Sequence, residues 1–296
     1  MPETRPPLTL QTLLAANPHT SALRSGELRS PLVDFVFADV KPANKAFKAL
    51  VREQTFDLGE LAIVTFLQAR AYGKPYCLMP AVAVARGQHH TIFFNPERGH
   101  LNPGDLNGRR VGVRSYTQTT GAWVRGFLQE DYGVDFRSVQ WITFEDPHVA
   151  EYTDPPWVQR GPEGKQLLRM LLDGEIDAAI FGSENPENTP LEPLIPDAVE
   201  VAARWAAKHG GVPINHMMVV KESITQARPD VVREVYRLLK ESTAAGPSEG
   251  AGVLRFGVEA VRKSLETIIQ YSEWQGLIPR RVSVDELFNG VTRSLD

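Results

Sequence analysis

The sequence predicts an α/β fold in two domains, and three observations support this prediction. The chain has 296 residues, which is enough for two domains of ordinary size or for one large domain. Short apolar runs alternate with amphipathic helical stretches, as in proteins built from strands and covering helices. A polar segment at 95–110 contains two prolines and three glycines, so it is a candidate crossover between the domains.

The first half of the chain contains apolar runs that have the length of buried strands. The expected strands are Leu32–Phe37, Tyr76–Arg86 and Thr91–Phe94, and the expected helices are Asn44–Arg52 and Thr65–Ala71. Four apolar residues at helical spacing support the helix at 44–52. Leu61–Val64 is either a further short strand or the approach to the helix that follows it.

The second half shows the same alternation and ends in helices. The expected strands are Arg110–Val113, Asp177–Phe181 and Pro213–Val220, and the expected helices are Gly121–Tyr132, Lys165–Leu172, Asp230–Ser242, Val253–Tyr271 and Val284–Leu295. Two proline-rich stretches, 145–162 and 184–196, are typical of loops. The strand at 213–220 is expected to return the chain from the second domain to the first.

Composition excludes several classes of protein. Lys plus Arg number 32 and Asp plus Glu number 36, so the net charge of −4 argues against general electrostatic binding of nucleic acid. The single cysteine, Cys77, cannot form an internal disulfide or a cysteine-rich zinc site, and we expect it to be buried. The chain lacks the dinucleotide-binding, phosphate-loop, metalloprotease and nucleophile-elbow motifs.

The sequence shows no targeting or membrane segment. Its longest apolar runs fall far short of the roughly 20 residues that cross a bilayer. Its first 20 residues contain no apolar core of a signal peptide and no cleavage-site pattern. We therefore expect a cytoplasmic protein with neither a nucleic acid nor a membrane as its partner.

Three histidines are candidates for proton transfer. His89 and His90 are adjacent and precede a strand, where neighbouring side chains point to opposite faces, so one of them can face a ligand. The alternative is a pair of ordinary surface histidines. His216 lies in an apolar strand, where it is either a hydrogen-bonded core residue or an acid that titrates near neutral pH.

Polar residues beside buried strands are candidates for binding an acid. Glu60 adjoins a buried strand and needs a partner or a raised pKa, unless it caps the next helix. Arg86 ends a strand and can clamp a carboxylate, unless it is simply solvated. Ser115, Thr119 and Thr120 lie where a strand meets a helix, which is a place for binding anions or for plain helix capping.

Several segments share the pattern of one known family. They are Phe56–Arg70, Gly108–Val113, Tyr116–Gly126, Gln140–Trp141, Gly174–Ala178 and Pro213–His216. Together they resemble the 4,5-dihydroxyphthalate decarboxylase family, over residues 8–239. That resemblance implies the two-lobed fold of the type II periplasmic binding proteins, with a ligand cleft between the lobes. Lobe 1 would comprise 1–95 plus 217–296, and lobe 2 would comprise 96–216.

The resemblance also implies residue roles. The family's positions match Glu60, Thr65, one of His89 and His90, Tyr116, Thr119, Trp123 and His216. The chain departs from the family at Asn17–Thr20, where an acidic-Arg-Thr pattern is usual, and at Val64, where a hydroxyl is usual. These departures leave the identity of the acid open.

We therefore expect a decarboxylase of a hydroxylated aromatic (di)carboxylate. The expected catalytic residues are His89, His90, His216 and Glu60, and the expected substrate-binding residues are His19, Thr65, Arg86, Ser115, Tyr116, Thr119 and Thr120. Decarboxylation replaces CO2 by a proton on the ring carbon, so a histidine suits the proton transfer and a carboxylate can orient a phenolic proton. No cofactor is expected and no metal is required, although Glu60 with two histidines could bind a divalent ion.

Two alternatives remain on the same scaffold. One is a solute-binding protein of an ABC-type importer for a small organic anion, since a fold does not determine a function. The other is a different enzyme with this fold, such as the cytosolic menaquinone-pathway enzymes that look like binding proteins. The family resemblance also makes a homo-oligomer a plausible state.

Overall fold

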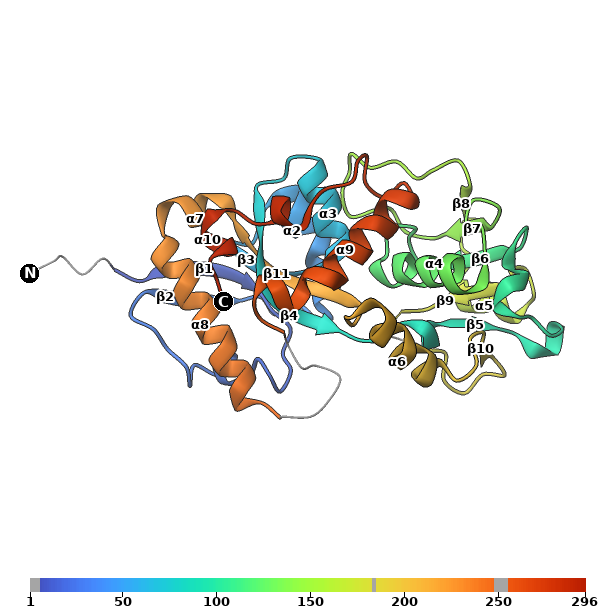
Figure 1. The fold of residues 1–296 in the computed structure, drawn as a ribbon, viewed down its shortest axis with the longest axis horizontal. Coiled ribbons are helices and arrows are strands. Elements are labelled where there is room, and N and C mark those ends of the chain that lie inside the picture. The colour runs from blue at the N-terminus through green and yellow to red at the C-terminus, as the bar shows by residue number, and fades with distance from the viewer. Residues whose placement is uncertain (1–5, 183–184, 248–254) are drawn as a thin grey trace, which may run out of the picture. The chain divides into compact units, whose positions relative to one another are not determined.

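The computed structural model describes residues 6–182, 185–247 and 255–296. Contacts between residues divide the chain into two compact units (Figure 1). Unit 1 comprises Met1–Arg86, Ile214–Glu266 and Val282–Asp296, and unit 2 comprises Gly87–Pro213 and Thr267–Arg281.

Unit 1 contains a five-stranded sheet in the order β2-β1-β3-β11-β4. Its strands are β1 (Leu8–Leu13), β2 (Val33–Phe37), β3 (Leu58–Ala62), β4 (Tyr76–Ala85) and β11 (Ile214–Lys221). β1 runs parallel to β2 and β3, whereas β11 runs antiparallel to β3 and β4. The carboxyl ends of β1 and β3 therefore lie at the same edge of the sheet, which is where open α/β sheets bind ligands.

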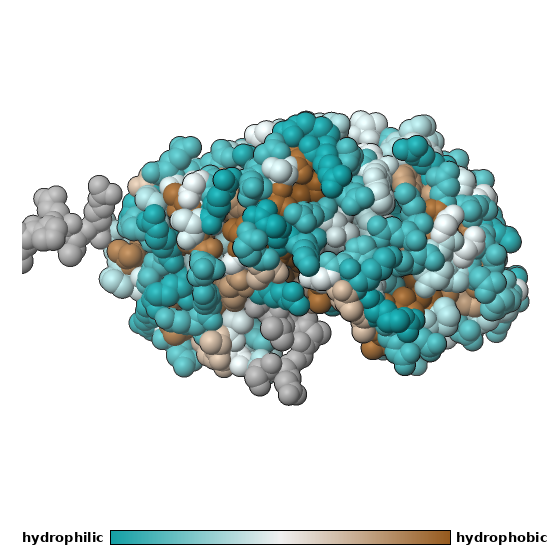
Figure 2. All heavy atoms as spheres, viewed as in Figure 1, coloured by the Kyte–Doolittle hydropathy of each residue, from teal (hydrophilic) through white to brown (hydrophobic). Residues whose placement is uncertain are grey.

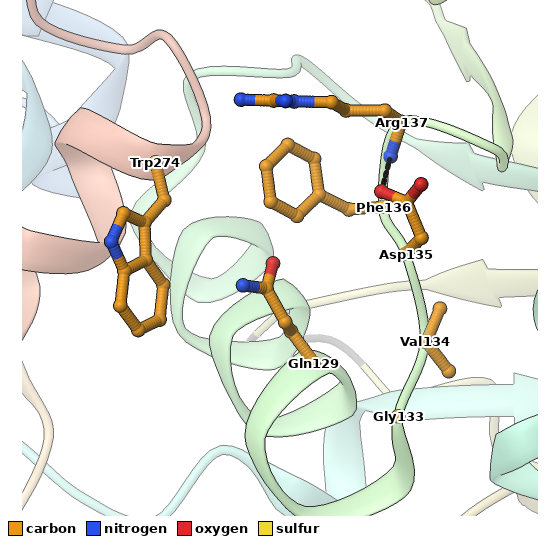
Figure 3. Close-up of a pocket in the computed structure, with 7 residues that line it drawn as sticks. All are labelled: Gln129, Gly133, Val134, Asp135, Phe136, Arg137 and Trp274. Carbon is orange, nitrogen blue, oxygen red and sulfur yellow. Dashed lines mark hydrogen bonds between the residues drawn. The ribbon is translucent and has the colours of Figure 1, made fainter.

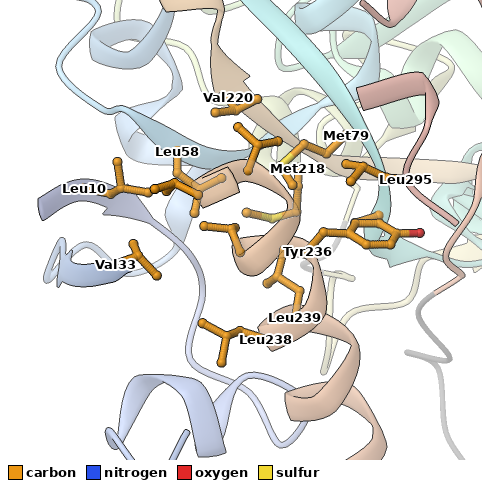
Figure 4. Packing of buried hydrophobic residues seen from close by; sticks show 14 of the residues in the cluster. Leu10, Val33, Leu58, Met79, Met218, Val220, Tyr236, Leu238, Leu239 and Leu295 are labelled. Carbon is orange, nitrogen blue, oxygen red and sulfur yellow. The ribbon is translucent and has the colours of Figure 1, made fainter. Parts of the chain in front are cut away.

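Helices cover this sheet, and apolar side chains of both the helices and the sheet form the core of unit 1. They are α1 (Ser21–Arg24), α2 (Phe47–Glu53), α3 (Ile63–Ala71), α7 (Glu222–Ala227), α8 (Pro229–Ala245) and α10 (Gly290–Arg293), with 3-10 turns at Ala43–Ala46 and Val284–Leu287. Figure 4 shows Leu58 and Met218 of the sheet packed with Leu239 of α8. Complete burial of such a side chain contributes about 1.5–3 kcal/mol.

Unit 2 contains a six-stranded sheet in the order β10-β5-β9-β6-β7-β8. Its strands are β5 (Ile92–Phe94), β6 (Arg110–Val113), β7 (Gln140–Thr143), β8 (Val158–Arg160), β9 (Ala178–Ile180) and β10 (Glu192–Pro193). Its helices are α4 (Thr119–Tyr132), α5 (Leu167–Leu172) and α6 (Ala198–His209), with 3-10 turns at His89–Thr91, Pro96–Arg98 and Pro103–Leu106. Helix α9 (Val258–Trp274) contributes residues to both units.

The predicted lobe boundaries differ from this division in three places. Residues 87–95 belong to unit 2 because β5 pairs with β9. Residues 214–216 belong to unit 1 because β11 pairs with β3 and β4. Residues 267–281, predicted in lobe 1, group with unit 2, where Tyr271 and Gln275 contact α4.

Several predicted elements also differ from those observed. The predicted loops contain the short strands β8 and β10, and the sequence did not lead us to expect β1 or α6. The predicted last helix is a 3-10 turn followed by α10. Residues 253 and 254 of a predicted helix and residue 184 of a predicted loop lie outside the described residues. These differences arise where pairing or packing with distant residues decides the local structure.

The burial of the single cysteine agrees with the prediction from the sequence. Cys77 is buried as predicted, and burial raises the pKa of its thiol to about 11. Within the three described ranges, no helix combines the length and the apolar character needed to cross a bilayer. Hydrophilic side chains cover most of the face shown in Figure 2.

Candidate functional site

The predicted site residues fall in both units. Unit 1 holds His19, Glu60, Thr65, Arg86 and His216. Unit 2 holds His89, His90, Ser115, Tyr116, Thr119 and Thr120.

Glu60 and His216 lie together in the sheet of unit 1. Glu60, in β3, is 2 % exposed, and its Oε1 lies 3.5 Å from Nδ1 of His216. Its Oε2 accepts a hydrogen bond of 3.2 Å from the backbone N–H of Ala15. The N-cap residue of the next helix, α3, is Ala62 and not Glu60. Glu60 is thus a buried carboxylate with two partners, as burial of a charge requires.

His216 owes its position to an irregularity in β11. The pairing of β11 with β4 shifts register on both sides of His216. Such bulges re-aim side chains and occur often beside active sites. The imidazole packs at 5.1 Å against the edge of the Phe47 ring, and the side chain remains 23 % exposed. His216 therefore has a buried carboxylate 3.5 Å from Nδ1, an approach that is not a hydrogen bond in the described structure, and its side chain is partly open to solvent.

A pocket in unit 1 adjoins Glu60 at the carboxyl ends of β1 and β3. Its polar lining includes Asn17, His19 and Thr20, and its walls include Leu14, Ala81, Val82, Ala83, Met218, Leu239 and Phe256. Asn17 Oδ1 accepts the backbone N–H groups of His19 and Thr20, which fixes this turn. Nδ1 of His19 is buried without a hydrogen-bond partner in the described structure. Asn17, His19 and Thr20 belong to the segment where the sequence differs from the pattern of the family it resembles. These three residues therefore line the same pocket as Glu60.

Thr65 and Arg86 do not line this pocket. Thr65 is buried in the first turn of α3, and Arg86 follows β4 as a half-buried residue. Burial lowers the pKa of the Arg86 guanidinium. Their roles in binding substrate remain predictions.

The histidine pair of unit 2 lies in a 3-10 turn, His89–Thr91, that leads directly into β5, so it precedes a strand as predicted. His89 is wholly buried, its ring stacks at 4.0 Å on Phe127, and neither ring nitrogen has a hydrogen-bond partner among the described residues. Burial lowers the pKa of His89 to about 4, so its imidazole is neutral at pH 7. His90 is half-buried. Of the two, His90 is the one with access to solvent.

The buried imidazole of His89 leads to a prediction about acid stability. Between pH 6.5 and 4 the unfolded chain binds a proton at this histidine and the folded chain does not. The free energy of unfolding should therefore fall as the pH falls through this range, by up to about 3 kcal/mol. Replacing His89→Leu should flatten this dependence in urea titrations at several pH values, whereas replacing the exposed His100→Ala should not. Equal slopes for wild type and His89→Leu would contradict the prediction.

The segment 115–120 joins β6 to α4. The hydroxyls of Ser115 and Thr117 lie 3.1 Å apart, and Thr120 donates to Gln88 Oε1. Helix α4 begins at Thr119, two residues before the predicted start, and its N-cap residue Gln118 makes no side-chain cap. The N-cap position of α4 is therefore occupied by Gln118 and not by one of these hydroxyl residues. The segment places several hydroxyl groups at the positive end of a 14-residue helix.

Tyr116 is enclosed in unit 2. Its hydroxyl donates to the carbonyl of Gln275 at 3.3 Å and accepts from Nε1 of Trp157 at 2.9 Å. Burial raises the pKa of Tyr116. Its hydroxyl is thus engaged inside the unit, and a role in binding substrate remains a prediction. Arg125, which was not among the predicted site residues, lies with its guanidinium 4.0 Å from the Tyr116 ring centroid. A charged residue on the apolar side of a predicted helix was the available signal.

Another pocket in unit 2 contains none of the predicted site residues. Figure 3 shows Gln129, Phe136, Arg137 and Trp274 around it, and Asp135 accepts the backbone N–H of Arg137. Across the described ranges, no three His, Cys, Asp or Glu side chains are grouped so that they could hold a metal ion.

Comparison with known proteins identifies relatives with one name. No protein-family profile matches the chain. It is 30% identical over 237 residues to a 4,5-dihydroxyphthalate decarboxylase from Comamonas testosteroni, covering 75% of this chain and 71% of that protein. It is 32% identical over 166 residues to the protein of that name from Pseudomonas putida, covering 53% of this chain and 64% of that protein.

Solved structures show the same fold at low sequence identity. The alkanesulfonate-binding protein SsuA from Xanthomonas axonopodis pv. citri has a TM-score of 0.55 and 15% identity, covering 96% of this chain and 99% of that chain. A variant of the desulfurization enzyme DSZB in complex with biphenyl-2-sulfinic acid has a TM-score of 0.57 and 14% identity, covering 96% and 97%. The two-lobed α/β fold predicted from the sequence is therefore confirmed. The identity to the Comamonas protein, over most of both chains, shows that this chain belongs to the 4,5-dihydroxyphthalate decarboxylase family.

Proposed function

We propose that this protein is a decarboxylase that removes one carboxylate from a hydroxylated aromatic dicarboxylate such as 4,5-dihydroxyphthalate. The observation that carries the proposal is the buried Glu60 beside the partly exposed His216, in a chain of this family. An acid or base held by a carboxylate is a recurring arrangement for proton transfer.

In this proposal His216 delivers the proton to the ring carbon. Its Nδ1 faces Glu60, so the opposite nitrogen, Nε2, is the atom that can face a substrate. The bond between the ring and the leaving carboxylate breaks, and its electron pair stays on the ring carbon. A proton from Nε2 then bonds to that carbon. With 4,5-dihydroxyphthalate the products are CO2 and 3,4-dihydroxybenzoate, and solvent returns the proton to His216.

In unit 2 the segment 115–120 is the candidate for binding a substrate carboxylate. Hydroxyl donors at the start of α4 suit an anion, and the positive end of the helix adds to their attraction. His90 is the candidate proton carrier of unit 2, and His89 serves the core. Glu60 is proposed to orient the imidazole of His216, and Thr65, Arg86 and His19 to contribute to binding.

The proposal extends to the setting of the reaction. It includes a cytoplasmic location, a small aromatic carboxylate as partner, a homo-oligomeric state and a reaction that needs no cofactor. The support for these points is the family resemblance, together with chemistry that histidine and glutamate can perform alone.

Turnover in heavy water tests the proposed function. The purified protein should convert 4,5-dihydroxyphthalate into CO2 and 3,4-dihydroxybenzoate, followed by gas release and the ultraviolet spectrum. In D2O the product should carry one deuterium at the ring carbon that lost its carboxylate, as nuclear magnetic resonance would show. Thermal stabilisation by the acid without turnover would instead favour a solute-binding protein.

A further inference from the structure

Arg125 is a buried cation beneath the start of α4. It is wholly buried, and no ion pair within 4.0 Å joins it to another residue in the part of the chain that the structure describes, although the carboxylate of Asp154 acts on its charge from farther away. Burial lowers its pKa, but a guanidinium keeps its charge in proteins. Burying a charge destabilises a folded protein unless other groups compensate the charge, so the position of Arg125 needs a structural explanation.

The guanidinium links three parts of unit 2. Its Nε donates to Oε1 of Gln275 at 2.7 Å, and its Nη2 donates to the carbonyl of Tyr116 at 2.6 Å. Gln275 in turn donates from Nε2 to the carbonyl of Ala122, in the first turn of α4, at 2.9 Å. The segment 115–120 is thereby fixed at residue 116 and again just beyond its end.

The third nitrogen of the guanidinium lies against the first turn of α4. Nη1 is buried and has no hydrogen-bond partner in the described structure. A Cβ at Gly121 would lie 3.1 Å from Nη1, so the absence of a side chain there lets the guanidinium approach the helix start. The positive charge of Arg125 therefore adds to the positive end of the helix.

We propose that Arg125, held by Gln275, is a positioning residue that fixes the segment 115–120 and supplies the buried positive charge with which this segment binds a substrate carboxylate. This inference rests on the proposed function, because it assigns the carboxylate to that segment. Arg125 itself touches no substrate. It acts through the geometry of residues 115–120 and through its charge, which is screened little by salt because it is buried.

Two variants separate the charge of Arg125 from its hydrogen bonds. Arg125→Lys keeps the charge but cannot donate along the same two directions. Gln275→Glu keeps an acceptor for Nε and places a negative charge beside the guanidinium, so the positive potential falls, but it also loses the hydrogen bond that Gln275 donates to the carbonyl of Ala122. Arg137→Lys, at an exposed arginine of the same unit, is the matched control.

The readout compares ligands with and without carboxylates. For both variants we expect KM for 4,5-dihydroxyphthalate and the inhibition constant of 3,4-dihydroxybenzoate to rise about tenfold, which corresponds to about 1.4 kcal/mol. The Kd of catechol, which has the hydroxyls but no carboxylate, should stay unchanged, and kcat should change less than KM. Arg137→Lys should match the wild type.

The outcomes distinguish this inference from the proposed function. Parallel loss of affinity for catechol and for the acids would show a merely structural role and overturn the inference, as would unchanged affinities in both variants. If one variant fails to fold, the other decides. If the wild type binds the acids but does not turn them over, the proposed function fails. The role of Arg125 is still tested in that case, because thermal shift measures whether the two variants selectively lose binding of the acids.

Discussion

Replacing His216 by alanine is expected to reduce kcat for 4,5-dihydroxyphthalate by about 10²–10⁴-fold, the contribution that a positioned acid or base makes. The substitution removes the proton donor and leaves Glu60 buried with the Ala15 N–H as its remaining partner among the described residues. CO2 release under saturating substrate measures the effect. KM should change less than kcat, because the imidazole acts mainly on the transition state.

Two controls make this result specific. His100→Ala removes an exposed histidine that lies beside Asn102 in unit 2, and its activity should equal that of the wild type. Added imidazole should restore part of the activity of His216→Ala, because it can occupy the space left by the side chain. A His216→Ala protein with the kcat of the wild type would contradict the assignment of His216.

Replacing Gly126 by alanine is expected to destabilise unit 2 by about 1–3 kcal/mol or more, as overpacking of a core does. A Cβ at this position would lie 2.1 Å from two ring carbons of Tyr271. The ring cannot move freely, since it is buried and its hydroxyl donates to Glu130 at 2.6 Å. Urea denaturation followed by tryptophan fluorescence measures the loss, because Trp123 packs on the same ring.

Gly104 offers a matched control for this experiment. A Cβ there would approach only the carbonyl of Tyr132, at 3.4 Å, and its backbone does not adopt a left-handed conformation. Gly104→Ala should therefore unfold at nearly the urea concentration of the wild type. An unfolding free energy for Gly126→Ala equal to that of the wild type would show that Tyr271 is not fixed against α4.

Local patterns in the sequence sufficed for the α/β class and for Glu60. A carboxylate next to an apolar strand is expected to be buried with a partner. In the structure the partner of Glu60 is His216. The adjacency of His89 and His90 likewise indicated that the two side chains differ in environment. Periodicity could not reveal which one is buried, because that depends on Phe127, which is distant in sequence.

Other features depend on contacts that no local pattern encodes. An amphipathic pattern over 253–271 indicates that one face of a helix is buried, but not which unit covers it. The answer lies in Tyr271 and Gln275, whose partners on α4 are about 150 residues earlier in the chain. For the same reason the partners of Arg125 could not be predicted, since they are a side chain 150 residues away in the sequence and a backbone carbonyl.

The antiparallel pairing of β4 with β11 has a consequence for how the chain is assembled during synthesis. Ala85, at the end of β4, and Ile214, at the start of β11, are direct partners across the ladder. In topology the two strands are a hairpin whose turn has been replaced by an insertion, residues 87–213. The entropy of closing a loop rises only slowly with its length. Once the inserted residues have folded with their ends together, the sheet of unit 1 can accept β11, the strand between β3 and β4, late, as the last third of the polypeptide leaves the ribosome.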